Sequence, residues 1–165
     1  MNTVPFAKSA LKEALLAALD GEIAAALNAA RQAQETASHE GNKPENQYDT
    51  LALEAAYLAH GQSERIRELQ ETRILIGQWP VPDFSEDDTI ASGALIQLLD
   101  TQNNSAQQNQ RWLWIAPVGG RQLVTEGRTI AVLSTQAPLA QTLMRLSIGD
   151  EVVMGKERWE IGGVW

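Results

Sequence analysis

The chain has 165 residues, of which 44% are hydrophobic and 21% are charged, and its formal net charge is −8. This composition is typical of a globular protein with room for one ordinary domain or two small ones. Cysteine is absent, which excludes disulfides and thiolate metal sites and makes a reducing cytoplasm the expected setting.

The distribution of charge excludes further classes of protein. Charged side chains interrupt the apolar positions of the N-terminal stretch, and no run of about 18 uncharged apolar residues occurs, so neither a signal peptide nor a membrane span is predicted. Residues 1–76 carry 7 basic and 11 acidic side chains, and residues 77–165 carry 6 and 10, so each part has a charge of −4. Neither part has the basic excess that binding to phosphates needs. We therefore expect no direct binding of nucleic acid.

Two long helices are predicted at the start of the chain. Residues 8–38 contain no proline and are rich in alanine, the residue with the highest intrinsic helix propensity. A glycine and a proline shortly after residue 38 predict the end of this helix. A second helix is predicted from about Asn46, a possible N-cap, to Ile76, where Gly77 and two nearby prolines end it.

Both helices repeat small or apolar residues at alternating spacings of three and four, the heptad pattern of a coiled coil. The predicted seam is Leu16, Leu19, Ile23, Ala26, Ala30, Ala33 and Ala37 in the first helix, and Ala52, Ala55, Ala59, Gln62, Ile66, Leu69, Arg73 and Ile76 in the second. An antiparallel pairing sets large residues opposite large ones and alanines opposite alanines. The sequence therefore predicts a hairpin over residues 1–77 with its tip near residues 39–49, and we expect the stem of Arg73 to reach toward the surface.

The remainder of the chain has the pattern of a small sheet. Residues 78–88 contain two prolines and four acidic residues and are predicted to be a linker. Strands are predicted over residues 94–99, 112–115, 123–125, 129–133, 151–154 and 158–164, and a short helix over 139–146 after Pro138. The predicted class is α+β, with a five- or six-stranded, mostly antiparallel sheet domain over residues 89–165.

Three segments, in this order, resemble the GreA/GreB family of transcript-cleavage factors. They are the hairpin turn at residues 42–50, the return arm at 53–66, and residues 137–143 followed by 148–153. The resemblance covers nearly the whole chain. It implies that the C-terminal domain is similar to the FK506-binding-protein (FKBP-like) fold and docks on RNA polymerase, while the hairpin tip enters the secondary channel of that enzyme. It also implies a bacterial transcription elongation regulator that has no catalytic residues of its own and contacts nucleic acid only through the polymerase.

Acidic residues at the hairpin tip would act in trans according to this resemblance. Glu45 and Asp49, with Glu40 nearby, are the candidates to hold a Mg²⁺ ion shared with RNA polymerase, which would then cleave backtracked RNA. Mg²⁺ takes one or two carboxylates and keeps several waters, and a second metal ion orients the attacking water. No cofactor is expected on the protein alone.

The tip departs from the family pattern. The cleavage factors place an aspartate and a glutamate three positions apart, whereas Glu45 and Asp49 are four apart and share a helix face only if the helix begins by Glu45. Lys43 also lies within the tip. A factor that occupies the channel without cleaving, in competition with other channel factors, is therefore an open alternative, and the two acids could also simply favour a helix start.

The residues that match the docking segment of the family are Ala137, Pro138 and Leu139. The family often has a polar residue such as serine before this proline, whereas here the residue is alanine. Pro138 also fits the first turn of a helix without any role in docking. Trp112 and Trp114 point to one face of the sheet, where core packing or a docking patch would each use them.

Two other functions remain open on sequence alone. A prolyl isomerase needs an apolar pocket rimmed by aromatic residues, and both phenylalanines, Phe6 and Phe84, lie outside residues 89–165. A coiled-coil adaptor or holdase needs exposed apolar patches along the helices, for which Leu51 and Leu58 are the candidates. RNA polymerase is the expected partner, without a membrane, and the protein is expected to be a monomer.

Overall fold

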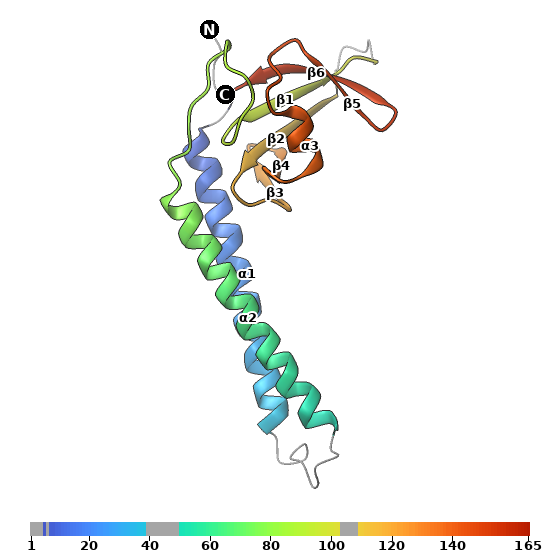
Figure 1. Cartoon of the computed structure of the whole chain (residues 1–165). Helices are drawn as coiled ribbons and strands as arrows, with labels where there is room; N and C mark the ends of the chain where they lie inside the picture. The colour runs from blue at the N-terminus through green and yellow to red at the C-terminus, as the bar shows by residue number, and fades with distance from the viewer. Residues whose placement is uncertain (1–4, 6, 39–49, 103–108) are drawn as a thin grey trace. The chain divides into compact units, whose positions relative to one another are not determined.

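The fold consists of two long helices followed by a sheet with one short helix (Figure 1). The computed structural model describes residue 5 and residues 7–38, 50–102 and 109–165. Its elements in chain order are α1 (Lys8–Ser38), α2 (Thr50–Gln78), β1 (Leu95–Asp100), β2 (Gln110–Ala116), β3 (Arg121–Thr125), β4 (Arg128–Ser134), α3 (Pro138–Leu143), β5 (Glu151–Met154) and β6 (Glu157–Val164). The predicted α+β class is confirmed.

The long helices lie close to where they were predicted. The helix α1 has the predicted bounds, whereas α2 runs past Ile76 to Gln78. Gly77 does not end it, because the decisive break comes from Pro80, which disfavours helical conformation at Trp79. The predicted start of the second helix at Asn46 lies outside the described residues.

The chain divides into two compact units, which are considered separately. Met1–Leu15 and Trp79–Trp165 form the sheet unit, and Leu16–Gln78 form the hairpin unit. Whereas the sequence-based division kept residues 1–77 together, the start of α1 groups with the sheet. Within the described part of the chain, no helix is both long and apolar enough to cross a membrane.

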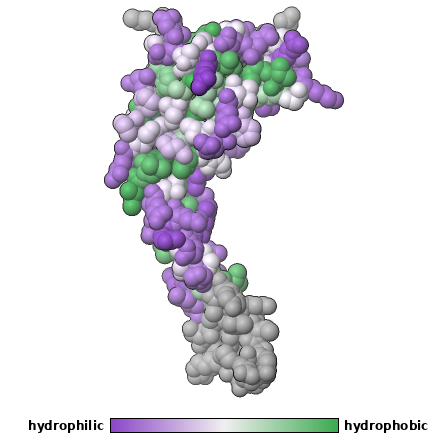
Figure 2. Space-filling model, viewed as in Figure 1, coloured by the Kyte–Doolittle hydropathy of each residue, from purple (hydrophilic) through white to green (hydrophobic). Residues whose placement is uncertain are grey.

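The seam of the hairpin unit follows the heptads. Leu19 and Ile76 are completely buried, Leu69 is nearly so, and Ala26 is also buried. Hydrophilic residues cover most of the described hairpin surface on the face shown in Figure 2, although Leu27, Leu58, Ile74 and Leu75 are exposed away from the seam. The hairpin is therefore held by a narrow apolar stripe, as the three-four spacing predicts.

Two ion pairs across the hairpin show its antiparallel direction. Arg73 donates hydrogen bonds to both carboxylate oxygens of Asp20, with 3.2 Å between Nη2 and Oδ2. The Nη2 of Arg65 lies 3.7 Å from the Oε1 of Glu22. The pairs Asp20–Arg73 and Glu22–Arg65 therefore advance along α1 while they move back along α2, as they must in an antiparallel pair. The stem of Arg73 does reach the surface, but its partner Asp20 was not predicted. The hydrogen bond from Arg73 lowers the pKa of the Asp20 carboxyl.

The sheet has six strands in the order β3-β4-β2-β1-β6-β5. Every neighbouring pair is antiparallel except β2 and β4, which are parallel. The prediction of a mostly antiparallel sheet is therefore confirmed. The predicted helix over residues 139–146 is wrong at its end, because α3 stops at Leu143. Arg145 then has a φ of 76°, which no α-helix accommodates.

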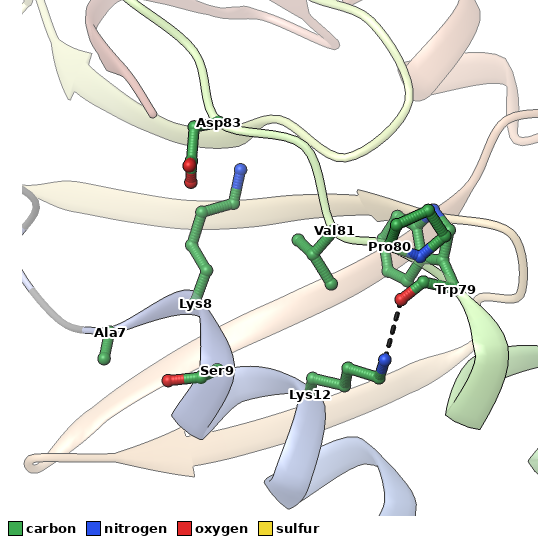
Figure 3. Close-up of a pocket in the computed structure, with 8 residues that line it drawn as sticks. All are labelled: Ala7, Lys8, Ser9, Lys12, Trp79, Pro80, Val81 and Asp83. Carbon is green, nitrogen blue, oxygen red and sulfur yellow. Dashed lines mark hydrogen bonds between the residues drawn. The ribbon is translucent and has the colours of Figure 1, made fainter.

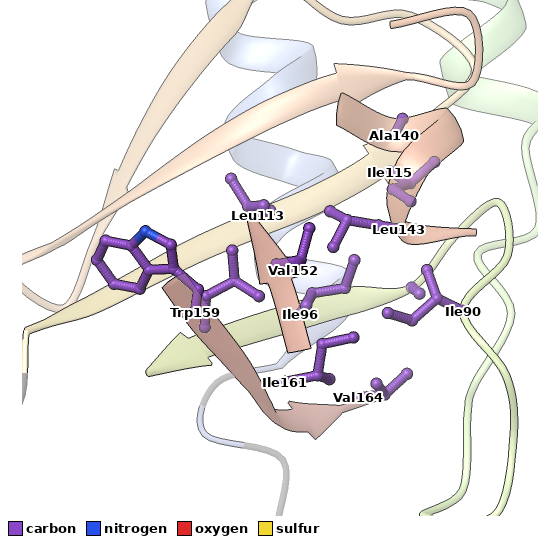
Figure 4. Close-up of a cluster of buried hydrophobic side chains, with 12 residues drawn as sticks. Ile90, Ile96, Leu113, Ile115, Ala140, Leu143, Val152, Trp159, Ile161 and Val164 are labelled. Carbon is purple, nitrogen blue, oxygen red and sulfur yellow. The ribbon is translucent and has the colours of Figure 1, made fainter. Parts of the chain in front are cut away.

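One face of the sheet packs against α3. Leu113 and Ile115 from β2 and Ile161 from β6 are buried there with Ala140 and Leu143 of α3 (Figure 4). The buried positions of α3 are three apart, so the opposite side of this short helix is left for solvent. The core thereby determines which face of α3 the molecule presents.

The other face of the sheet carries the two tryptophans of β2. Trp114 is fully buried, its ring centroid lies 5.4 Å from that of Trp79, and its Nε1 donates to the carbonyl of Gly93 at 3.2 Å. Trp112 is 7% exposed and stacks on Trp165 at 5.7 Å. Burial assigns both side chains to packing, so neither forms the docking patch considered from the sequence.

Candidate functional site

The predicted docking residues lie at the start of α3. Ala137 is the N-cap, with an extended backbone (φ −64°, ψ 136°), and Pro138 occupies the first turn, where its missing N–H costs no hydrogen bond. Ala137 and Leu139 are half-buried and pack on the core cluster, while Pro138 is exposed. We call Ala137, Pro138 and Leu139 the docking segment.

The docking segment has an open helix start. No side chain caps α3, because Ala137 has no oxygen to accept from the first N–H groups. Main-chain hydrogen bonds hold the start of α3 in place. The N–H of Ala137 donates to the carbonyl of Ser134 at 3.0 Å, and the N–H of Gln141 donates to the carbonyl of Ala137 at 3.0 Å. The start of α3 is therefore held by main-chain hydrogen bonds and by the packing of Ala137 and Leu139, without a side-chain cap.

A shallow groove of about 480 Å³ lies beside the docking segment. We call it the β3–β4 groove, and it is lined by Gly120, Arg121, Gln122, Ala131, Val132, Leu133, Ser134 and Ala137. The Nη1 of Arg121 donates to the carbonyl of Gly119 at 3.0 Å. A Cβ at Gly119 would lie 2.3 Å from the main-chain nitrogen of Ser134, so glycine permits this close approach of the chain. No residue pattern in the sequence predicted this groove.

The lining of the groove combines small or apolar residues with Arg121, Gln122 and Ser134, which suits contact with a partner. This lining contains no histidine, carboxylate or aromatic side chain, so neither acid–base chemistry nor an aromatic-rimmed proline pocket can be built there. Among the described residues, no group of three or more histidine, aspartate or glutamate side chains could hold a metal ion.

A second hollow of the sheet unit, of about 460 Å³, contains two lysines of α1 (Figure 3). The Nζ of Lys8 donates to the main-chain oxygens of Pro82 and Trp165, the latter at 2.7 Å, and lies 5.0 Å from the centre of the Phe84 ring. Lys12 donates to the main-chain oxygen of Trp79 at 2.7 Å. These bonds attach the first turns of α1 to the chain that follows α2.

Lys8 is an unusual buried cation. Its residue is 7% exposed. Burial lowers the pKa of its amine to about 8, and the negative charge of Asp83 opposes that shift. Because the amine is already bonded to two main-chain oxygens, we assign Lys8 a structural role. Sequence reasoning missed this role, since a lysine in the first turn of a helix is ordinarily solvated.

The predicted tip acids Glu40, Glu45 and Asp49 all lie outside the described residues, as does Lys43. The nearest part of the hairpin described with side chains ends at Thr36 in α1 and resumes at Leu58 in α2. The proposed Mg²⁺-holding pair, Glu45 and Asp49, therefore stays a prediction from the sequence.

Comparisons with known proteins give a limited result. No family model and no curated protein sequence matches the chain. GreA factor homolog 1 of Thermus thermophilus has a similar structure over 91% of this chain and 94% of its own, with 12% identity and a TM-score of 0.37. Another structure of the transcription factor Gfh1 covers 92% of this chain and 93% of its own, with 11% identity and a TM-score of 0.36. Gfh1 of Thermus aquaticus covers 88% of this chain and 90% of its own, with 13% identity and a TM-score of 0.35. Values this low give no basis for transferring a function.

Proposed function

We propose that this chain is a transcription elongation regulator that binds RNA polymerase through the docking segment and inserts its hairpin tip into the secondary channel. The observation that carries the proposal is the exposure of Pro138 on a rigidly held segment of the sheet unit. It stands exposed at the first turn of α3, while its neighbours Ala137 and Leu139 are anchored on the core. A rigidly held apolar residue loses little entropy on binding, which favours a docking role.

The form of the hairpin unit supports insertion into a narrow channel. The helices α1 and α2 have 31 and 29 residues, which correspond to lengths of about 45 Å. The seam changes from leucine and isoleucine to alanine toward the tip, and small side chains let helices approach each other closely. A long, thin and polar hairpin is suited to reach a buried catalytic centre.

The adaptor or holdase alternative finds less support along the described hairpin. Of the two candidates, the side chain of Leu51 lies outside the described residues and Leu58 is 62% exposed. Leu27 of α1 is 52% exposed, and Ile74 and Leu75 lie sixteen or more residues beyond Leu58 in α2. Leu27 follows the seam residue Ala26 and Leu58 precedes the seam residue Ala59. In an antiparallel pair these two positions lie on opposite sides of the seam, so the leucines form no common apolar strip. A client-binding surface needs a contiguous patch.

The role of the tip acids belongs to the same proposal. Glu45 and Asp49 would hold a Mg²⁺ ion together with the polymerase. With Glu40, the third predicted tip acid, they would stimulate RNA cleavage in trans. The alternative within the proposal is a regulator that occupies the channel without cleaving. The four-residue spacing of the two acids and the presence of Lys43 in the tip favour that alternative.

RNA cleavage in a stalled, backtracked elongation complex tests the proposal. The wild-type chain is compared with Glu45→Ala/Asp49→Ala, and binding to RNA polymerase is measured in parallel. Cleavage that depends on both acids supports a cleavage factor, whereas binding without cleavage supports a channel-occupying regulator. Absence of both binding and cleavage would refute the proposed function.

A docking variant makes the same experiment specific for α3. Pro138→Asp should weaken binding to RNA polymerase at least about tenfold, because it places a charge at the centre of the proposed contact. Val153→Asp is the matched control, since Val153 is an apolar residue that is 61% exposed on the edge strand β5. Equal affinities for the two variants would argue against docking through α3.

A further inference from the structure

Arg145 has a strained backbone directly after the docking helix. Its φ is 76°, in the left-handed region that residues with a Cβ avoid because that atom approaches a carbonyl oxygen. Glu126, with a φ of 49°, is the other non-glycine residue with positive φ in the described part of the chain. Glycine would adopt either conformation at lower cost.

The fold imposes this conformation on Arg145. Its N–H donates to the carbonyl of Ile90 at 2.9 Å, and the N–H of Ile90 donates to the carbonyl of Leu146 at 2.8 Å. Ile90 is 1% exposed in the core cluster, and Leu146 packs against that cluster. The two hydrogen bonds and the burial of their neighbours hold residue 145 in place. Strained residues of this kind persist only where the surroundings determine them, and they concentrate at functional sites.

The side chain of Arg145 contributes no contact that would offset this strain. It is exposed, and within the described part of the chain its guanidinium forms no ion pair and no hydrogen bond. Arg73 and Arg111, by contrast, each pair with a carboxylate. Folding alone would therefore be served better by glycine at this position.

The position of Arg145 connects it to the docking segment. Residues 140 and 143 are buried, whereas residues 138, 141, 142 and 145 are exposed. The helix α3 has six residues, about 9 Å of helix, and Arg145 follows its end by two residues, so Pro138 and Arg145 are exposed positions at the two ends of one short helix. A partner that covers Pro138 comes within reach of a long guanidinium side chain.

We infer that Arg145 is a docking residue whose guanidinium pairs with a carboxylate on the RNA polymerase surface that meets the docking segment. The inference rests on the proposed function. A guanidinium offers two parallel N–H donors to a carboxylate and gains specificity from that geometry. Residues 77–165 have a net charge of −4, which disfavours the dense negative charge of a nucleic-acid backbone. The attraction to a single carboxylate on a protein surface comes from the local positive charge of Arg145.

The test uses the full chain and two glycine substitutions that relieve strain at different places. Arg145→Gly removes the guanidinium together with the strain. Glu126→Gly is the matched control, because it relieves strain in the β3–β4 turn, at the opposite end of those strands from Ala137. Affinity for RNA polymerase and the midpoint of thermal unfolding are measured for both variants.

Both variants should unfold about 2 to 4 °C above the wild type, but only Arg145→Gly should lose affinity, by about tenfold. The loss should shrink at high salt, because an ion pair is screened. A more stable Arg145→Gly variant that binds RNA polymerase like the wild type would overturn the inference and leave the proposed function standing. If the wild type itself does not bind, the proposed function fails and the inference fails with it.

Discussion

The buried amine of Lys8 should make the stability of the sheet unit depend on pH in an unusual direction. In the unfolded chain the amine titrates near 10.5, and in the folded protein its pKa is about 8. Below pH 8 both states hold the proton. Between pH 8 and 10.5 the unfolded state holds more protons than the folded state, so the free energy of unfolding rises with pH. Lys8→Met removes this dependence.

The size of the effect follows from the two pKa values. The difference between 10.5 and about 8 is roughly 2.5 pH units, and each unit corresponds to about 1.4 kcal/mol. Relative to Lys8→Met, the wild type should therefore gain about 3 kcal/mol across this interval. Because other groups titrate in the same range, the prediction concerns the difference between the two proteins and not either curve alone.

Denaturant unfolding followed by tryptophan fluorescence measures this difference. All five tryptophans lie in Trp79–Trp165 and therefore report on the sheet unit. Unfolding free energies are compared from about pH 7 to about pH 10. Lys156→Met, in the exposed turn between β5 and β6, controls for the loss of one lysine charge. A stability difference between wild type and Lys8→Met that stays flat or falls with rising pH would refute the reasoning.

Three further outcomes are expected. Ala137→Ser should stabilise the protein by about 1 kcal/mol by capping α3; an unchanged unfolding midpoint would contradict this. Gly93→Ala should destabilise by about 2 kcal/mol, because its φ is +101° and a Cβ there would lie 2.3 Å from Cγ of Pro82; wild-type denaturant resistance would count against it. Arg73 lowers the pKa of Asp20, so the wild type should be more stable than Asp20→Asn at neutral pH when unfolding is followed by circular dichroism. This difference should disappear in acid, once Asp20 is protonated below its ordinary pKa of 3.8. A difference that persists in acid would argue against the ion pair.

The parts of the fold that depend on short-range periodicity could be predicted from the sequence. The three-four spacing identified the buried seam residues Leu19, Leu69 and Ile76, and the same pattern implied the antiparallel direction. Contacts between distant residues could not be predicted. Lys8 bonds to main-chain oxygens 74 and 157 residues away, and no local pattern marks those partners. The parallel pairing of β2 with β4 is equally non-local.

The candidate site could be predicted from the sequence only where a local pattern marks it. Pro138 was placed at a helix start because its ring suits the first turn, and it lies there. Arg145 was missed, because helix ends of this kind are recognised by a glycine and the sequence has none at that position. The predicted helix therefore ran through residue 145. The roles of Glu40, Glu45 and Asp49 stay predictions.

The division of the chain into units also bears on how the protein folds. The sheet unit is assembled from two stretches of chain, one before Leu16 and one after Gln78. Joining them from a disordered chain means closing a long loop, which carries an entropic cost and slows folding. The hairpin needs only contacts between consecutive helices, and once formed it brings its own two ends together. Rapid formation of the hairpin would then lower the entropic cost of bringing the two stretches of the sheet unit together. Substitutions in the seam should therefore slow the refolding of the sheet, although the seam residues do not belong to it.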